Sequence, residues 1–362
     1  MQPRDTCTRL IQKSGFVNYS ISTNKNDYLS NYSDRDKKWD NHANNRDALS
    51  CRLFDIGNDR GNNELLKYSE KIDSCALTLQ YKPQTNMQTG EVTIKLKKAF
   101  FCKKRTCPLC SWRRSMKNFW LIFTRIKEAV EKDKLVPLFL TLTVPNVEVD
   151  NLRDKSKDMT RAWNNLMKRK ELKSIKGWVK TTEITYSQKY KNAHPHFHVI
   201  LLVSSTYFKC DEYIKRDRWL QLWQQATNDP SITQVDIRRV KPRIENIDGK
   251  KVLDIYNNST LPTNDGLMNA VLEVSKYATK SSDLLACDDN FLVGYINQIK
   301  GLRFIATGGA LKDAMKEEHD NLINLNDDED EDGEEEDDLI TFNYIRPIHK
   351  YKRSRPTVSV SP

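Results

Sequence analysis

The sequence contains no run of 18 apolar residues and no signal-peptide pattern at its start. An α-helix needs about that many apolar residues to cross a bilayer, and a secretory leader joins basic residues to a short apolar run. These absences lead us to expect neither a membrane-spanning helix nor a secretory leader. We therefore expect a cytoplasmic protein, with one or two domains in its 362 residues.

Glycine and histidine are scarce, with 12 and 6 residues respectively. The adjacent pair Gly308-Gly309 ends an apolar stretch, which is too weak a signal for a phosphate-binding loop. Histidine is also concentrated, because three of the six lie at positions 194, 196 and 198. This cluster is the first place to look for chemistry.

Acidic residues are rare outside one segment. Residues Asp327 to Asp338 hold 11 acids in 12 positions, which leaves 38 acids against 59 lysines and arginines elsewhere, a net charge of +21. A chain this basic predicts a polyanionic partner, usually nucleic acid. The alternative is a solvated cationic surface, and for the acidic run a solubilising tail is favoured over a mimic of nucleic acid.

Hydrophobic periodicity predicts strands and helices in alternation along most of the chain. Alternating apolar residues predict strands over 75–81, 92–96, 136–144, 178–186, 194–203, 232–240 and 301–309. Helical spacing predicts helices over 111–132, 152–170, 211–227 and 266–281. We therefore predict an α+β fold, with a mainly antiparallel sheet and helices packed on one face of it.

Composition divides the chain into four regions. Residues 1–72 are rich in Asn, Asp, Ser and Lys and are predicted to be disordered or loosely ordered, with a short helix near Asn63 to Lys71. A Cys-rich, zinc-binding segment is expected over 73–115 and a catalytic domain over 116–315. The tail, 316–362, is acidic and then basic and is also predicted to be disordered.

The segment Ala193 to Val203 has the pattern of a strand with two different faces. Because side chains alternate along a strand, His194, His196 and His198 share one face, while the other is apolar. Neighbouring imidazoles suit a divalent metal, since each neutral ring offers a nitrogen lone pair. The alternative is a core strand whose histidines are merely hydrogen-bonded.

A second strand, 178–186, precedes the histidine strand closely enough to form a hairpin with it. Glu183 would then lie beside His196 and His198. Two imidazoles and a carboxylate with open positions form a catalytic site for Mg²⁺ or Mn²⁺. His194 is the rival third ligand or a phosphate contact, and Glu183 would then be an exposed strand carboxylate.

Three cysteines follow the first two predicted strands with the spacing Cys-x4-Cys-x2-Cys. A Cys-x2-Cys pair reaches one tetrahedral zinc from a tight turn. The fourth ligand would be Cys75, which lies upstream at the start of the first predicted strand. We predict a structural zinc site from these residues, with unrelated thiols as the alternative: Cys75, Cys102, Cys107 and Cys110.

The predicted helix 266–281 carries a second group of reactive side chains. Glu273 and Tyr277 are four residues apart and share one face, and Lys276 and Lys280 flank them. Taken in isolation, a helical tyrosine beside lysines is usually a packed or surface residue. The histidine strand in the same chain favours a functional role.

Four segments resemble one protein family. The string His194 to Val203 is similar to the His-hydrophobe-His motif of the HUH endonucleases, in particular the rolling-circle plasmid replication initiators. Val136–Val144 resembles their first motif, and Glu273 to Tyr277 resembles their nucleophile motif. The Cys-rich segment followed by Trp112-Arg113-Arg114 is also similar, and the resemblance covers about residues 75–310.

The resemblance implies site-specific DNA nicking and rejoining. It implies that Tyr277 attacks the phosphodiester, giving a 5′-phosphotyrosyl intermediate and a free 3′-OH. Glu273 is implied as a second catalytic group, which could activate water because the motif holds one tyrosine. Lys276, Lys280 and the metal would favour the ionised tyrosine.

The expected partners are replication-origin DNA, single-stranded or in a hairpin at the nick, and the host helicase and polymerase. Two alternatives of other kinds stay open at this point. One is a transposase or relaxase with the same metal chemistry. The other is a zinc-containing DNA-binding regulator without catalysis, which would need neither the histidine strand nor the Glu273/Tyr277 pair; an RNA-binding protein is a weaker rival, because the histidine strand does not fit it.

Overall fold

The computed structural model of the chain divides into two compact units, residues 1–113 with 320–362 and residues 114–319. The residues that it describes are 27–85, 87–88, 90, 92–209, 213–240, 244–247, 250–253, 266–276, 279–312, 322–323 and 339–354. Across these ranges, no helix has the length and apolar character that a bilayer crossing requires. Each unit is described below by itself.

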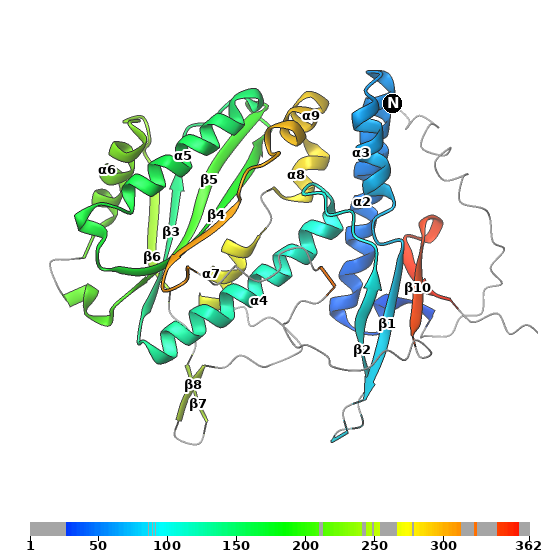
Figure 1. The fold of residues 1–362 in the computed structure, drawn as a ribbon, viewed down its shortest axis with the longest axis horizontal. Coiled ribbons are helices and arrows are strands. Elements are labelled where there is room, and N and C mark those ends of the chain that lie inside the picture. The colour runs from blue at the N-terminus through cyan, green and yellow to red at the C-terminus, as the bar shows by residue number, and fades with distance from the viewer. Residues whose placement is uncertain are drawn as a thin grey trace, which may run out of the picture. The chain divides into compact units, whose positions relative to one another are not determined.

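The first unit packs helices against one face of a four-stranded antiparallel sheet with the order β11-β10-β1-β2 (Figure 1). Its elements are η3 (Leu29–Asn31), α2 (Asp34–Asp59), α3 (Asn63–Asp73), β1 (Thr78–Thr85), β2 (Val92–Ala99), the first turn of α4 (Pro108–Lys132), β10 (Ile340–Ile345), η8 (Arg346–Ile348) and β11 (Lys350–Arg353).

The predicted disorder of residues 1–72 is wrong over 34–59, which form α2, whereas α3 confirms the short helix predicted near Asn63 to Lys71. Helix α2 begins at a cap, because the Ser33 hydroxyl accepts a hydrogen bond from the Asp36 amide. The helix buries Trp39, Leu49 and Leu53 among many polar residues. The apolar stripe is hard to detect because Arg46, which is fully buried, interrupts it. Residues 1–26 of the predicted region lie outside the described residues.

The predicted disorder of the tail, 316–362, is wrong over 340–353. Strand β10 pairs with β1, and β11 pairs with β10, so one sheet joins segments that lie far apart in the sequence. Arg346 between them forms an ion pair with Asp73 at 2.7 Å. Local composition does not reveal a strand partner that lies so far away in the sequence. The acidic run 327–338 lies outside the described residues.

The second unit contains a five-stranded antiparallel sheet with the order β6-β3-β5-β4-β9, which confirms the predicted α+β class. Besides the remainder of α4, its elements are β3 (Val136–Thr143), η4 (Val149–Asn151), α5 (Leu152–Leu166), η5 (Lys170–Leu172), β4 (Ile175–Ser187), β5 (Asn192–Val203), η6 (Ser205–Lys209), α6 (Arg216–Thr227), β6 (Val235–Arg239), β7 (Ile244–Ile247), β8 (Lys250–Leu253), α7 (Gly266–Ser275), α8 (Ser281–Ala286), α9 (Asp289–Gln298) and β9 (Ile305–Gly309).

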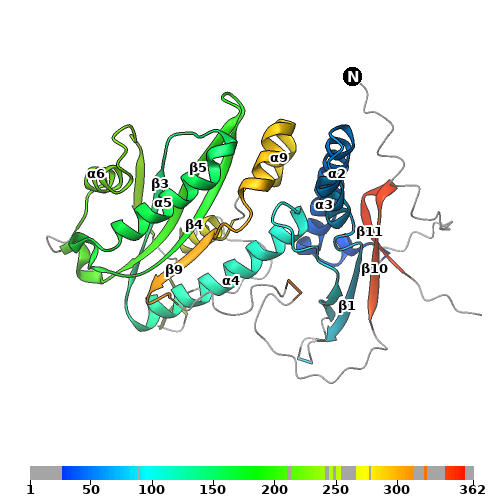
Figure 2. The ribbon, with the colours of Figure 1, turned by 45° about the horizontal axis from the view of Figure 1, so that its top comes forward.

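Helices cover both faces of this sheet, so the expectation of helices on one face is wrong. Trp163 of α5 and Trp219 of α6 pack with Phe197 on one face. Phe123 of α4 and Val271 of α7 pack on the other, as Figures 1 and 2 show for α5 and α4. The second apolar layer exists because β5 buries residues on both faces along its second half.

The pair Gly308-Gly309 lets the end of β9 approach β4 closely. A Cβ on Gly308 would lie 2.4 Å from the Trp178 ring. Gly309 has a φ of +59°, and a Cβ there would lie 2.2 Å from the carbonyl oxygen of Lys176. These glycines therefore serve packing at the end of the sheet.

Lys180 of β4 is buried on the face away from the histidines, with Nζ 3.6 Å from the centre of the Phe197 ring. Burial, with Arg303 nearby, lowers its pKa to about 7. The unfolded chain keeps this proton up to its usual pKa of about 10.4. Between these values the unfolded state binds more protons, so stability should rise with pH.

We expect Lys180→Met to raise stability at pH 7 by about 1–4 kcal/mol, because it removes the cost of burying the charge. The pH-dependent rise between pH 7 and 10 should also flatten. Urea unfolding of both proteins at pH 7, 8.5 and 10 measures this. Parallel stability curves for the variant and the unsubstituted chain would contradict it.

Candidate metal centre and replication site

Strand β5 places two imidazoles at the middle of the sheet. His196 and His198 lie on the same face, are 8% and 9% exposed, and have their Nε2 atoms 3.1 Å apart. The alternate residues Phe197 and Val199 are fully buried on the opposite face. The predicted two-faced strand is therefore observed, with an apolar layer that holds the imidazoles in position.

Strand β4 brings a carboxylate to the same point, because Glu183 is paired directly with His196 in the β-ladder. Its Oε2 atom lies 3.2 Å from Nε2 of His196 and 2.8 Å from Nε2 of His198. Burial alone would raise the pKa of Glu183, but the hydrogen bonds and charges of the two imidazoles hold it well below its usual range. The glutamate is therefore ionised at neutral pH.

The outer ring nitrogen of each histidine, Nδ1, also lies near a polar atom. Nδ1 of His196 lies 3.3 Å from the backbone oxygen of His194, which only accepts. Nδ1 of His198 lies 3.3 Å from the hydroxyl of Thr141, on the neighbouring strand β3. If both Nδ1 atoms carry the proton, both Nε2 lone pairs face the carboxylate.

This donor set fits a divalent cation. In that tautomer the Oε2 atom of Glu183 and the two Nε2 atoms would repel one another, and a cation between them would remove this repulsion. Ligands at about 2.1 Å from an octahedral cation lie about 3 Å apart when adjacent, and the three observed separations are 2.8, 3.1 and 3.2 Å. Glu183, His196 and His198 could therefore hold a metal ion.

His194, the rival third ligand, lies beside this group. Its ring centre is 5.4 Å from that of His196, and burial together with the His196 charge lowers its pKa. Among the described residues, the donor group at this point contains Glu183 and not His194. The geometry favours His194 as a neighbour of the site.

Helix α7 brings the predicted second catalytic group to the same face. An oxygen of Glu273 lies 3.5 Å from Nε2 of His198, and Lys276 forms an ion pair with Glu273. Lys280 caps the start of α8, and its side chain is exposed. Helix α7 ends at Ser275, earlier than the predicted 281, and Tyr277 lies outside the described residues.

The chain after Tyr277 returns to strand β4. The hydroxyl of Thr279 donates to the backbone oxygen of Ile184 at 2.8 Å and is bonded to the Tyr295 hydroxyl at 2.7 Å. Ile184 is the neighbour of Glu183, so described residues on either side of position 277 lie at this site. Thr279 and Tyr295 were missed in the sequence, because single polar residues in a helical segment carry no signal of their own.

Two further residues near the site were not predicted. Thr141 could have been detected as a polar residue in an otherwise apolar strand, on the same face as Phe139. Arg238 of the edge strand β6 lies over the Phe139 ring at 5.0 Å, and that ring centre is 5.6 Å from the His198 ring. This places an exposed arginine two strands away from the histidines, where a phosphate could meet it.

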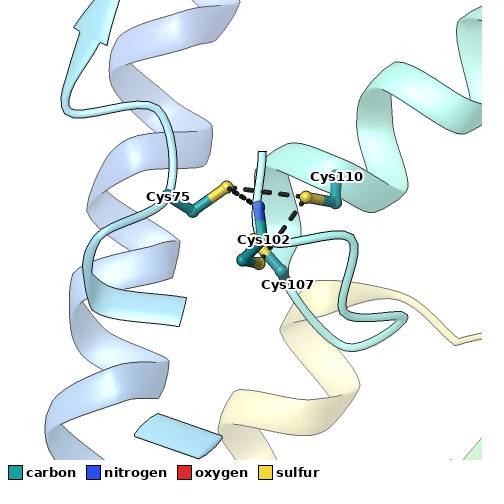
Figure 3. A group of neighbouring side chains, drawn as sticks. All are labelled: Cys75, Cys102, Cys107 and Cys110. Atoms are coloured by element: carbon teal, nitrogen blue, oxygen red, sulfur yellow. Dashed lines mark hydrogen bonds between the residues drawn. The ribbon is translucent and has the colours of Figure 1, made fainter. Parts of the chain in front are cut away.

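The first unit holds a second donor group, made of the four predicted cysteines. Their sulfur atoms all lie within 4.8 Å of one another. Sγ of Cys110 lies 3.5 Å from that of Cys75 and 3.6 Å from that of Cys102. Figure 3 shows the side chains converging from the segment after α3, the loop before α4 and the first turn of α4.

The backbone next to two of these cysteines has an uncommon conformation. Ala76 and Lys103 follow Cys75 and Cys102, and both have positive φ values, 51° and 57°, which are costly for residues with a Cβ. Burial raises the pKa of the Cys107 thiol. A bound cation would offset the repulsion between thiolates here, so the cluster could hold a metal.

Comparison with known proteins gives a consistent result. A sequence model of the family described as "replication protein" matches residues 93–352. "Protein rep" of Bacillus amyloliquefaciens is 36% identical over 284 residues, 76% of this chain and 79% of the relative. "Protein rep" of Streptococcus pneumoniae is 31% identical over 307 residues, 82% and 86% of the two chains. No solved structure matches the chain.

The family match spans both the histidine strand and helix α7, so the class is that of replication initiators. The chain belongs to the replication protein family, and the predicted membership of the rolling-circle plasmid replication initiators is confirmed. Initiation of plasmid replication is therefore its general role.

Proposed function

We propose that this initiator is an HUH-type nickase that cleaves one strand of origin DNA by tyrosine attack and rejoins it at termination. The observation that carries this proposal is the contact between Glu273 and His198. It joins the segment that resembles the nucleophile motif to the Glu183–His196–His198 group. A binding protein without catalysis would need neither the group nor the contact.

The three donors would hold Mg²⁺ or Mn²⁺. The ion would act as a Lewis acid on the scissile phosphate. The β4–β5 hairpin keeps Glu183 ionised and aims both imidazole nitrogens at the same point. Arg238 and Lys276 supply positive charge on the same face for the flanking phosphates of the strand.

Tyr277 is the proposed nucleophile. Its neighbours in the chain, Lys276 and Thr279, contact Glu273 and Ile184 at this site. A free tyrosine has a pKa of about 10, so adjacent positive charge is needed to favour the oxyanion. Its oxygen would form a bond to phosphorus while the bond to the 3′-oxygen breaks and that oxygen takes up a proton. The free 3′-OH is what the host polymerase extends.

Glu273 is proposed to activate the water or terminus that ends the covalent intermediate, as the motif holds no second tyrosine. Glu273→Gln should leave the first cleavage within about tenfold and slow release of the DNA by about 10²-fold or more, since a general base contributes about that factor. Single-turnover gels that follow the covalent complex measure both steps. Lys276→Gln breaks the same ion pair but removes the charge that favours the tyrosine oxyanion, so it should slow the first cleavage more than the release; slowed release of equal size in both variants would contradict the role of Glu273.

The cysteine cluster is proposed to hold a structural zinc ion. Sulfur atoms bound to a tetrahedral zinc at about 2.3 Å lie about 3.8 Å apart, close to the observed 3.5 and 3.6 Å. Metal analysis should give about one zinc per chain, and Cys110→Ser should lower it strongly. Cys287→Ser, at another buried cysteine, should leave the zinc content unchanged. Equal zinc contents in both variants and the unsubstituted chain would mean that the cluster binds no zinc.

The partners that follow are the origin DNA, single-stranded or extruded at the nick, and the host helicase and polymerase that continue replication. This work would take place in the cytoplasm. The test is cleavage of end-labelled single-stranded fragments, covering the DNA that carries this gene, in the presence of Mn²⁺. Cleavage at one site, lost in chelator, is the expected result; tight binding with no cleavage would favour a zinc-containing regulator.

A further inference from the structure

The sheet of the first unit has an unusual charge. Its four strands together contain seven lysines and arginines and no aspartate or glutamate. The whole chain holds 49 acids in 362 residues, about one in seven. The charged residues of these four strands are therefore all of one sign.

The two faces of this sheet differ. One face is apolar and packs against α2 and η3: Trp39 contacts Tyr351, Tyr32 contacts Phe342, and Asp40 accepts from the Tyr351 amide. The buried residues on that face are Leu79, Tyr81, Ile94, Leu96, Phe342, Tyr344 and Tyr351. Because side chains alternate, Lys82, Lys95, Lys98 and Lys352 lie on the opposite, outer face, whereas Arg353 is paired with Phe342 of the apolar face.

The register arranges the polar side chains of the outer face in rows. Lys98 is paired with Gln80, and Gln80 with Thr341. In the next row Thr78 is paired with Asn343, and Asn343 with Lys352. Lysines thus alternate with amides and hydroxyls, which are the side chains that hydrogen-bond to phosphate oxygens.

One cross-strand pair on this face brings two positive charges together. Lys82 and Lys95 lie directly opposite each other in the β1–β2 ladder. A polyanion lying across this pair would meet both ammonium groups at once. The charge pattern therefore points to a ligand with closely spaced negative charges.

The absence of aromatic rings from the outer face of these four strands favours double-stranded over single-stranded DNA as the ligand. All aromatic residues of the strands lie on the buried face. Single-stranded DNA is normally bound on aromatic side chains that stack with its bases. Double-stranded DNA keeps its bases inside and offers its phosphates, which suits a face of lysines and amides.

We propose that the outer face of the β11-β10-β1-β2 sheet is a second DNA-binding surface, which holds the phosphate backbone of double-stranded DNA. The inference rests on the proposed function to the extent that the ligand is the same origin DNA. It adds a duplex-binding surface on the first unit to the single-strand chemistry of the second. The contacts are to phosphate, so the surface contributes affinity without reading sequence.

The test compares two double variants. One carries Lys82→Gln and Lys95→Gln, and the control carries Lys67→Gln and Lys71→Gln. Lys67 and Lys71 are exposed residues of α3 in the same unit, so both chains lose two charges. Full-length proteins bind a fluorescent duplex of about 40 base pairs at several salt concentrations. Each lost phosphate contact lowers the slope of log affinity against log salt by about 0.9.

The Lys82/Lys95 variant should bind the duplex at least about tenfold more weakly near 0.1 M salt, with a slope lower by about two. The α3 control should match the unsubstituted chain. Equal losses in both variants, or a loss limited to single-stranded DNA, would overturn the proposal. Nicking by the unsubstituted chain is measured separately on a short single-stranded oligonucleotide. If no nicking occurred, the proposed function would be refuted, and the duplex-binding comparison would still test the second surface.

Discussion

Replacing His196 and His198 together by alanine should abolish metal-dependent nicking. Both Nε2 atoms lie within 3.2 Å of the Glu183 carboxylate, and the double variant leaves that carboxylate as the one remaining donor of the group. Lewis-acid stabilisation of a phosphoryl transition state is worth several kcal/mol. At about 1.4 kcal/mol per factor of ten, the nicking rate should fall by at least about 10³-fold.

The same variant should lose the stabilisation that the metal gives the folded chain. A ligand at 100 times its dissociation constant raises the free energy of unfolding by about 2.7 kcal/mol, so Mn²⁺ should raise the melting temperature of the unsubstituted protein and not of the variant. His198→Asn, with less loss of volume, guards against a folding defect. His194→Ala is the matched control on the same strand face, and full activity in the double variant would refute the metal site.

The second large effect is expected from Tyr277→Phe, which removes one oxygen atom. Without that oxygen no bond to phosphorus can form, so the covalent protein–DNA complex should vanish. Binding of the same DNA should stay within about twofold, because the lysines, Arg238 and the donor group are unchanged. A denaturing gel for the complex and a filter-binding titration measure the two properties.

Tyr190→Phe is the matched control for this variant. Tyr190 lies in the loop between β4 and β5 and is 60% exposed, so loss of its hydroxyl should leave the covalent complex intact. If Tyr277→Phe still formed the complex, the nucleophile would be another residue. If it lost DNA binding as well, the tyrosine would be acting in recognition and not in the chemistry.

The sequence predicts the grouping of Glu183, His196 and His198 well because its geometry is local. Alternation along β5 puts His196 and His198 on one face, and the short connection to β4 makes Glu183 the residue opposite His196. The position of Glu273 is different, because it lies far from His198 in the sequence and on a separate element. Periodicity places Glu273 on a helix, and the family resemblance supplies its functional role.

Two parts of the fold could not be obtained in this way. Helix α2 buries an arginine, Arg46, whose guanidinium donates to the Cys75 backbone oxygen at 2.7 Å and lies over the Tyr344 ring. A buried charge breaks the apolar stripe by which helices are predicted. Strands β10 and β11 belong to a sheet whose other strands, β1 and β2, are distant in the sequence, and local composition carries no sign of that relation.

The same buried contacts explain why the cysteine segment is not a separate small module. Arg46 ties α2 to Cys75, and Tyr351 of β11 donates to the backbone oxygen of Ala76, the next residue, at 2.6 Å. The cluster is therefore the centre of a unit built from segments that are far apart in the chain. Local spacing identifies its four cysteines, whereas its surroundings depend on contacts between these distant segments.

The most direct test of the central claim is to identify the residue that carries DNA after cleavage. The protein is incubated with Mn²⁺ and a single-stranded fragment containing the nick site, digested with protease and nuclease, and the nucleotide-bearing peptide is sequenced by mass spectrometry. We expect a phosphodiester on Tyr277, linked to the 5′ end of the DNA. A nucleotide on any other residue, or cleaved DNA with no peptide attached, would contradict the proposed mechanism.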